Sequence, residues 1–139
     1  MLTQAQANRL LSELKDAVRS DIFVWEHYQR QDEILRAAGD EKLQFVLTLT
    51  RNPFEIKLHA RTRDRHIGLL RIDNAPFHIN PDGSELRDTP HMHIYREGCG
   101  LDWAEPIDWY DLENPFGTLE KFLIEFRARF PSGITLAMV

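Results

Sequence analysis

The sequence has little cysteine and no long apolar run. Cys99 is the single cysteine, so the sequence allows no intrachain disulfide and no cluster of thiolate metal ligands. No stretch approaches the roughly 18 apolar residues of a membrane span, and the N-terminus lacks the apolar core of a signal peptide. These absences favour a cytoplasmic protein that does not insert into a membrane.

Internal repeats, low-complexity segments and flexible linkers are also absent. The 139 residues therefore predict one domain, 1–139, with a single core. A net charge of −5 argues against a protein that coats nucleic acid. The charge is uneven, because cationic residues concentrate between Arg51 and Asp73 and acidic residues between Glu97 and Glu125. This asymmetry predicts a local anion site on an otherwise acidic molecule. A solvated face that pairs the basic run 57–65 with the acidic C-terminal third would also explain it, and we favour that explanation over RNA binding.

Several segments alternate apolar and polar residues, which is typical of β-strands. We expect strands at 43–50, 54–62, 66–73 and 91–96. Residues 134–139 are expected to form an edge strand or a packed tail.

Other segments have the periodicity of amphipathic helices. Helices are expected near 3–18 and 118–130, and a short helix over 32–38 would end at Gly39. The segment 103–115 is expected to be an ordered loop. Together these elements predict an α+β fold, with an antiparallel sheet of about four to five strands and the N-terminal and C-terminal helices packed on one face.

The most informative strand is 90–98, Pro-His-Met-His-Ile-Tyr-Arg-Glu-Gly. Residues two apart share one face of a strand, so His91, His93, Tyr95 and Glu97 should project together. Two imidazoles, a phenol and a carboxylate on one face cost stability unless they are hydrated, paired or functional. This face is therefore the first candidate for a site, although cross-strand hydrogen bonding would also explain the two histidines.

Three motifs carry a resemblance. The Asn-Pro-Asp-Gly turn at 80–83, the Pro-His-x-His-Ile-Tyr-Arg-Glu-Gly strand and the Trp-Ala pair at 103–104 follow one another. Together they resemble a family of small uncharacterised bacterial and prophage proteins. The resemblance implies a mobile-element setting and carries over no catalytic residue.

The first functional hypothesis is a protein that acts by occupying a host protein or a nucleoprotein complex, as anti-defence proteins do. An acidic surface can imitate a nucleic-acid backbone, and aromatic residues can anchor an interface. The residues expected to bind are Lys57, His59, Trp103, Asp108, Trp109, Asp111 and Glu113.

The second hypothesis is a metal-independent ribonuclease. RNA cleavage needs a base, an acid and cations for the phosphate, and histidine suits the first two roles because its pKa lies near 6.5. His91 and His93 would be the base and the acid, Tyr95 a donor, and Arg61 or Lys57 the phosphate ligand. The acidic C-terminal third counts against RNA as the partner.

The third hypothesis is a divalent metal site, although no cofactor is the default expectation. His91-x-His93-x3-Glu97 has the spacing of the first cupin motif, in which two histidines and a glutamate hold a metal. His78 could add a ligand, but the second cupin motif is absent.

Overall fold

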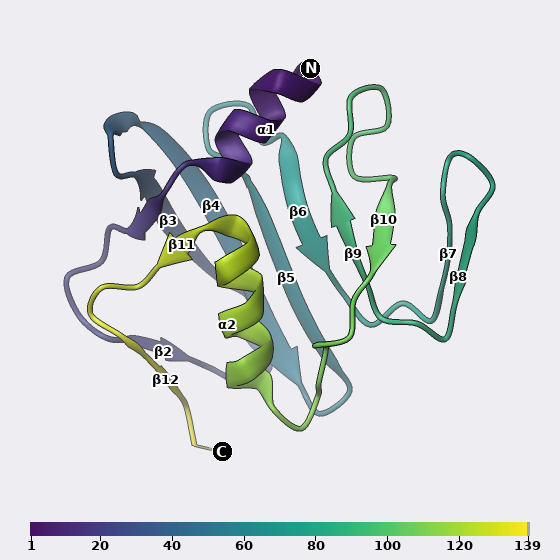
Figure 1. Ribbon diagram of the computed structural model, residues 1–139. Helices are drawn as coiled ribbons and strands as arrows, with labels where there is room; N and C mark the ends of the chain where they lie inside the picture. Colours follow the sequence, from purple (N-terminus) through teal and green to yellow (C-terminus); the bar gives the residue numbers. More distant parts are fainter. Residues whose placement is uncertain (139) are drawn as a thin grey trace.

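The structure, a computed structural model, describes residues 1–138. Within these residues the chain forms two helices and twelve strands. The strands of the main sheet are β1 (Lys15–Ala17), β3 (Gln31–Ala37), β4 (Asp40–Asn52), β5 (Glu55–Thr62), β6 (Gly68–Ile72), β9 (His91–Ile94), β10 (Ala104–Pro106) and β11 (Ala128–Arg129). They lie in the order β10-β9-β6-β5-β4-β3-β1-β11 (Figure 1).

Two small strand pairs flank this sheet. β2 (Phe23–Trp25) pairs in parallel with β12 (Ile134–Leu136), so the segment predicted as an edge strand or tail is a strand through Leu136, and Val139 lies outside the described residues. β7 (Phe77–Ile79) and β8 (Glu85–Arg87) form an antiparallel hairpin beyond β10 (Figure 1).

The predicted fold class is wrong. The protein is mostly β, and its main sheet has eight strands rather than four to five. The sheet is mixed, because β1 pairs in parallel with β11 and antiparallel with β3. The segment 32–38 is not a helix: residues 32–37 lie in β3, which pairs with β4 over most of its length. Pairing of two adjacent strands outweighs the helical propensity of this short segment.

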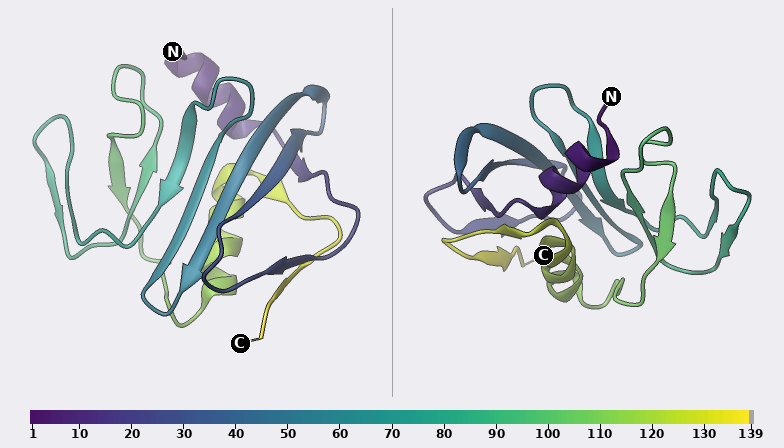
Figure 2. Two further views of the ribbon diagram at one scale, coloured as in Figure 1. Left: turned by 180° about the vertical axis from the view of Figure 1, so that it is seen from behind. Right: turned by 45° about the horizontal axis from the view of Figure 1, so that its top comes forward.

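Both helices lie on one face of the sheet (Figures 1 and 2). α1 (Gln4–Ser12) begins at a capping box of Thr3 and Gln6, but it ends well before position 18, and the chain continues into β1. α2 (Pro115–Phe126) buries the apolar stripe expected from its periodicity. The core lies between α2 and the sheet.

The opposite face of the sheet carries the polar residues of the central strands. On β4 and β5, polar residues alternate with apolar residues whose side chains are buried in the core. The polar residues are Thr48, Lys57, His59 and Arg61, and the buried ones are Leu47, Leu49, Leu58 and Ala60. No helix within residues 1–138 is long and apolar enough to cross a membrane.

Candidate histidine cluster and basic cavity

Three histidines meet at the β9 end of the polar face. His91 and His93 come from β9, and His78 comes from β7 of the neighbouring hairpin. Their ring centroids lie 4.7 Å (His78–His93), 5.2 Å (His91–His93) and 5.5 Å (His78–His91) apart. One ring nitrogen from each lies within 4.8 Å of the other two. We call these three residues the histidine cluster.

The hairpin reaches the cluster because Asn80 attaches it to the main sheet. The side-chain amide of Asn80 donates to the carbonyl of Ala104 at 2.9 Å and accepts from its N–H at 2.8 Å. Ala104 is the register partner of His93, so this contact places β7 directly beside the two β9 histidines. The predicted Asn-Pro-Asp-Gly turn thus has a structural role: Gly83 adopts the positive φ of 87° that the turn needs.

Hydrogen bonds to carbonyl oxygens fix the tautomer of each ring. His91 Nδ1 lies 2.9 Å from the Thr89 carbonyl, and His93 Nδ1 lies 2.7 Å from the Leu101 carbonyl. His78 Nε2 lies 2.8 Å from the Asp102 carbonyl. A carbonyl only accepts, so each of these nitrogens carries the proton. The remaining nitrogens, Nε2 of His91 and His93 and Nδ1 of His78, keep free lone pairs.

One of these lone-pair nitrogens is buried without a partner. His91 is 1% exposed, and among residues 1–138 its Nε2 has no hydrogen-bond partner. Burial also lowers the pKa of His93 to about 4, although its bond to the Leu101 carbonyl acts in the opposite direction. His93 is therefore neutral at physiological pH. A neutral imidazole with a fixed tautomer and a free lone pair is the form that binds a metal ion.

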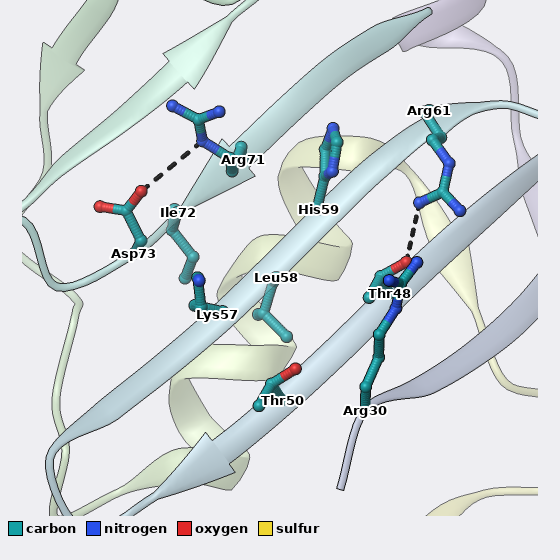
Figure 3. A pocket seen from close by; sticks show the side chains of 10 residues that line it. All are labelled: Arg30, Thr48, Thr50, Lys57, Leu58, His59, Arg61, Arg71, Ile72 and Asp73. Atoms are coloured by element: carbon teal, nitrogen blue, oxygen red, sulfur yellow. Dashed lines mark hydrogen bonds and ion pairs between the residues drawn. The ribbon is translucent and has the colours of Figure 1, made fainter. Parts of the chain in front are cut away.

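A basic cavity of about 460 Å³ lies on the same polar face (Figure 3). Its charged and polar lining residues are Arg30, Thr48, Thr50, Lys57, His59, Arg61, Arg71 and Asp73. Figure 3 shows Lys57, His59 and Arg61 side by side on β5, with Arg71 on the next strand. The strand register joins the cavity to the cluster, because His59 pairs with Arg71 and Arg71 pairs with His93.

The cations of the cavity differ in whether a carboxylate lies near them. Arg71 Nε lies 3.6 Å from an Asp73 carboxylate oxygen, and Arg30 lies 3.5 Å from Asp32. Arg61 instead donates to the hydroxyl of Thr48 at 2.8 Å. Burial, with Arg61 and Arg71 acting in the same direction, lowers the pKa of His59 to about 4. The cavity is therefore cationic through its arginines and lysine, while His59 is neutral at physiological pH.

The structure brings together part of the predicted site. His91, His93, Lys57, His59 and Arg61 share the polar face. The interpretation of the β9 face was wrong for two other residues, because β9 ends at Ile94 and the alternation stops there.

Tyr95 and Glu97 instead hold the N-terminal segment. Tyr95 belongs to the core, and its hydroxyl accepts from the Leu2 N–H at 3.0 Å and donates to the Leu2 carbonyl at 2.6 Å. The Glu97 carboxylate accepts from the Gln4 N–H at 2.8 Å, at the start of α1. The predicted ligand set of His91, His93 and Glu97 is therefore not assembled, and His78 stands where a third ligand would be.

The predicted interaction residues lie elsewhere. Asp108, Asp111 and Glu113 are exposed in the segment between β10 and α2. Trp109 packs partly against the core, and the ring of Trp103 lies under the guanidinium of Arg96 at 3.6 Å. Both tryptophan rings therefore already make contacts within the fold.

Sequence reasoning left Arg71 and Arg30 out of the site. Arg71 stands between the buried Leu70 and Ile72, and this alternation on β6 could have placed it on the polar face. Arg30 precedes the segment 32–38, which the sequence predicts to be a helix, so no pattern in the sequence places Arg30 in the cavity.

Residues 2–127 match the model of a family described as "Family of unknown function (DUF6978)". The chain belongs to this family. No curated protein and no solved structure matches it. The DUF6978 match covers every residue of the histidine cluster and the basic cavity.

Proposed function

We propose that the histidine cluster binds one first-row transition-metal ion and that the protein is a metal-dependent hydrolase. The observation that carries this proposal is the buried His91, whose Nε2 has no partner among residues 1–138, in a cluster where one ring nitrogen from each of three histidines lies within 4.8 Å of the other two. A buried polar atom without a partner costs about 1–3 kcal/mol, and a metal ion would remove that cost.

The ligand set favours zinc as the first ion to test. Imidazole suits Zn²⁺, Cu²⁺, Fe²⁺ and Ni²⁺, whereas Mg²⁺ and Ca²⁺ prefer oxygen. Three nitrogens bound tetrahedrally at about 2.0–2.1 Å lie roughly 3.4 Å apart, so small rotations of side chains now within 4.8 Å would close the site. Three protein ligands leave a fourth position for water, the arrangement of catalytic zinc sites.

Each ligand also has the outer support that metal-binding histidines need. The carbonyls of Thr89, Leu101 and Asp102 hold the protonated nitrogens and so orient the rings. Asn80 Oδ1 adds a further contact to His78 at 3.0 Å. The geometry is therefore arranged before an ion arrives.

Titration of metal-free protein with Zn²⁺ and Co²⁺ tests the proposal. We expect one equivalent to bind and Co²⁺ to give the visible absorption of a tetrahedral complex. The double change His91→Gln and His93→Gln, and separately His78→Gln, should weaken binding at least about 100-fold, because loss of outer-shell contacts alone costs 10–100-fold.

The control is His66→Asn, at an exposed turn position with φ of 55° that asparagine tolerates. It should bind the ion as the wild type does. Absence of stoichiometric binding, or unchanged binding by the folded double variant, would overturn the proposal.

A metal-independent ribonuclease is the second candidate. It is favoured by the position of Arg71 between His59 and His93, which would place a phosphate next to a neutral histidine base. RNA cleavage that persists in EDTA and is lost on replacement of His91 and His93 would select this function over the metal centre.

The interaction hypothesis stays a prediction, together with the mobile-element and anti-defence setting that the motif resemblance implies. Its acidic residues Asp108, Asp111 and Glu113 are exposed. Charge reversal at these positions should weaken binding to a partner, most visibly at low salt.

A further inference from the structure

The basic cavity concentrates positive charge on an acidic protein. The chain carries a net charge of −5, yet four cationic side chains and one carboxylate line this cavity. Among residues 1–138, Lys57 and Arg61 have no carboxylate within 4 Å. A solvated surface disperses like charges, whereas an anion site gathers them.

The cavity and the histidine cluster form one continuous row across the sheet. The register runs from Thr48 to His59, from His59 to Arg71, and from Arg71 to His93. Neighbouring strands lie about 4.7–4.9 Å apart, so this row extends roughly 14 Å. A ligand in the cavity would therefore lie on the same face of the sheet as a ligand of the histidine cluster.

The charge balance of the row selects the ligand class. Imidazole ligands bring no negative charge, so three of them would leave the full charge of a divalent ion uncompensated, and Arg71 lies on the neighbouring strand. The ion and the Arg71 guanidinium are both positive and would repel each other. An anion in contact with the ion and with Arg71 would remove this repulsion. Guanidinium groups match phosphate oxygens in pairs, and Arg61 and Arg71 stand on either side of His59.

We infer that the basic cavity binds the phosphate groups of a single-stranded nucleic acid. Three of the cations lie on two neighbouring strands, Lys57 and Arg61 on β5 and Arg71 on β6, and Arg30 precedes β3. Because they are spread over an open face, they suit successive phosphates better than one compact anion. One phosphate lies beside Arg71 next to the histidine cluster, and the following phosphates lie along Arg61 and Lys57. The position of the first phosphate at an ion rests on the proposed function, whereas the cavity contacts do not.

Gly68 contributes to the shape of this surface. A Cβ atom there would lie 2.5 Å from Leu101 Cδ1 and 3.1 Å from His59 Nε2. Glycine therefore lets Leu101 lie against the sheet beside His59, and the carbonyl of Leu101 holds His93. A larger residue would push the Leu101 side chain away from its place beside His59.

Binding of a labelled single-stranded RNA oligonucleotide, measured by fluorescence anisotropy with metal-free and zinc-loaded protein, tests the inference. The variant is Lys57→Gln with Arg61→Gln, which removes the two cations without a carboxylate partner and leaves the histidine cluster intact. We expect affinity to fall at least about 10-fold and the salt dependence to weaken by about 1.4 in the slope of log K, for two lost phosphate contacts.

The matched control is Arg63→Gln with Arg65→Gln, which removes the same charge at the turn that follows β5. It should change affinity less than about threefold, because those residues lie outside the cavity. Equal losses in both variants, or no loss in the first, would overturn the inference.

A second arm compares the oligonucleotide with a nucleoside monophosphate and inorganic phosphate. Tighter binding of the oligonucleotide supports a nucleic acid as the ligand. Equally tight binding of the nucleoside monophosphate would overturn the inference that the ligand is a polynucleotide. If zinc does not bind but the oligonucleotide does, and the Lys57 and Arg61 variant abolishes it, the proposed metal function fails and this inference stands.

Discussion

Each face of the main sheet has a buried basic side chain, and the two side chains differ in whether their nitrogen atoms have hydrogen-bond partners. On the helix-covered face Lys15 is fully buried, and its ammonium group donates to the carbonyls of Leu11, Glu13 and Phe126 at 3.2, 2.8 and 2.7 Å. On the open face His91 is buried to the same degree, yet its Nε2 has no partner among residues 1–138.

If the proposed metal function holds, this difference separates a structural group from a ligand-binding one. Lys15 satisfies carbonyls at the C-terminal ends of both helices, where a cation is favoured, and it lies over the ring of Phe126 at 3.9 Å. Its bonds are complete without a ligand. Each ring of the histidine cluster is also hydrogen-bonded to a backbone carbonyl. Where the three rings converge, however, the buried Nε2 of His91 has no partner among residues 1–138.

The covered face should be the more sensitive of the two to loss of volume. Phe122→Ala should lower the free energy of unfolding by about 3–5 kcal/mol, because Phe122 is completely buried under the sheet and the change leaves a large cavity. Urea melts measure this loss. Phe116→Ala, on the exposed side of the same helix, is the control and should cost less than about 1 kcal/mol. Equal losses would mean that α2 does not pack as described.

The bonding of Lys15 should matter less than this packing but still measurably. Lys15→Met keeps most of the side-chain volume and leaves three carbonyls without their donor, so we expect a loss of about 1–3 kcal/mol. Urea melts at pH 6 are suitable, because burial lowers the pKa of Lys15 to about 7 and the group is then charged. A gain in stability would show that Lys15 is not a structural cation.

The smallest effect should be the pH dependence caused by His59. Its pKa in the folded protein, about 4, lies below its ordinary value of 6.5. Between these pH values the unfolded chain takes up a proton that the folded protein does not, so the free energy of unfolding falls as the pH falls. His59→Gln should reduce this fall by about 1 kcal/mol, because the half-buried ring is partly screened.

Denaturant melts at pH 7.5, 5.5 and 4.5 measure the effect of His59→Gln. Exposed His66 is the matched histidine, and His66→Asn should leave the pH dependence of the wild type unchanged. A dependence on pH that is identical in the His59 variant would place the acid sensitivity elsewhere on the open face.

The elements that could be predicted from the sequence are those with enough residues to display a period. β4 and β5 alternate over many positions, and α2 shows a full apolar stripe. The strands of three residues, such as β1 and β10, are too short to show alternation. Their existence depends on pairing partners distant in sequence, so local pattern could not reveal them.

The candidate site could be predicted in part for the same reason. Two residues two apart on β9 share a face, which gave His91 and His93. His78 reaches them only because Asn80 attaches the hairpin to Ala104, a contact between positions that no periodicity connects. Tyr95 and Glu97 were wrongly grouped with the histidines because the end of β9 is set by the turn that follows it.

The attachment of the hairpin has a consequence for chain topology. Positions 78 and 91 are joined by a segment that contains the turn at Asn80 to Ser84 and both strands of the hairpin. An ion bound by His78, His91 and His93 would close that segment into a loop and act as a cross-link, which stabilises a fold by restricting the unfolded chain. With Cys99 as its single cysteine, the chain cannot make such a link through sulfur, and coordination by imidazole would be its means of making one.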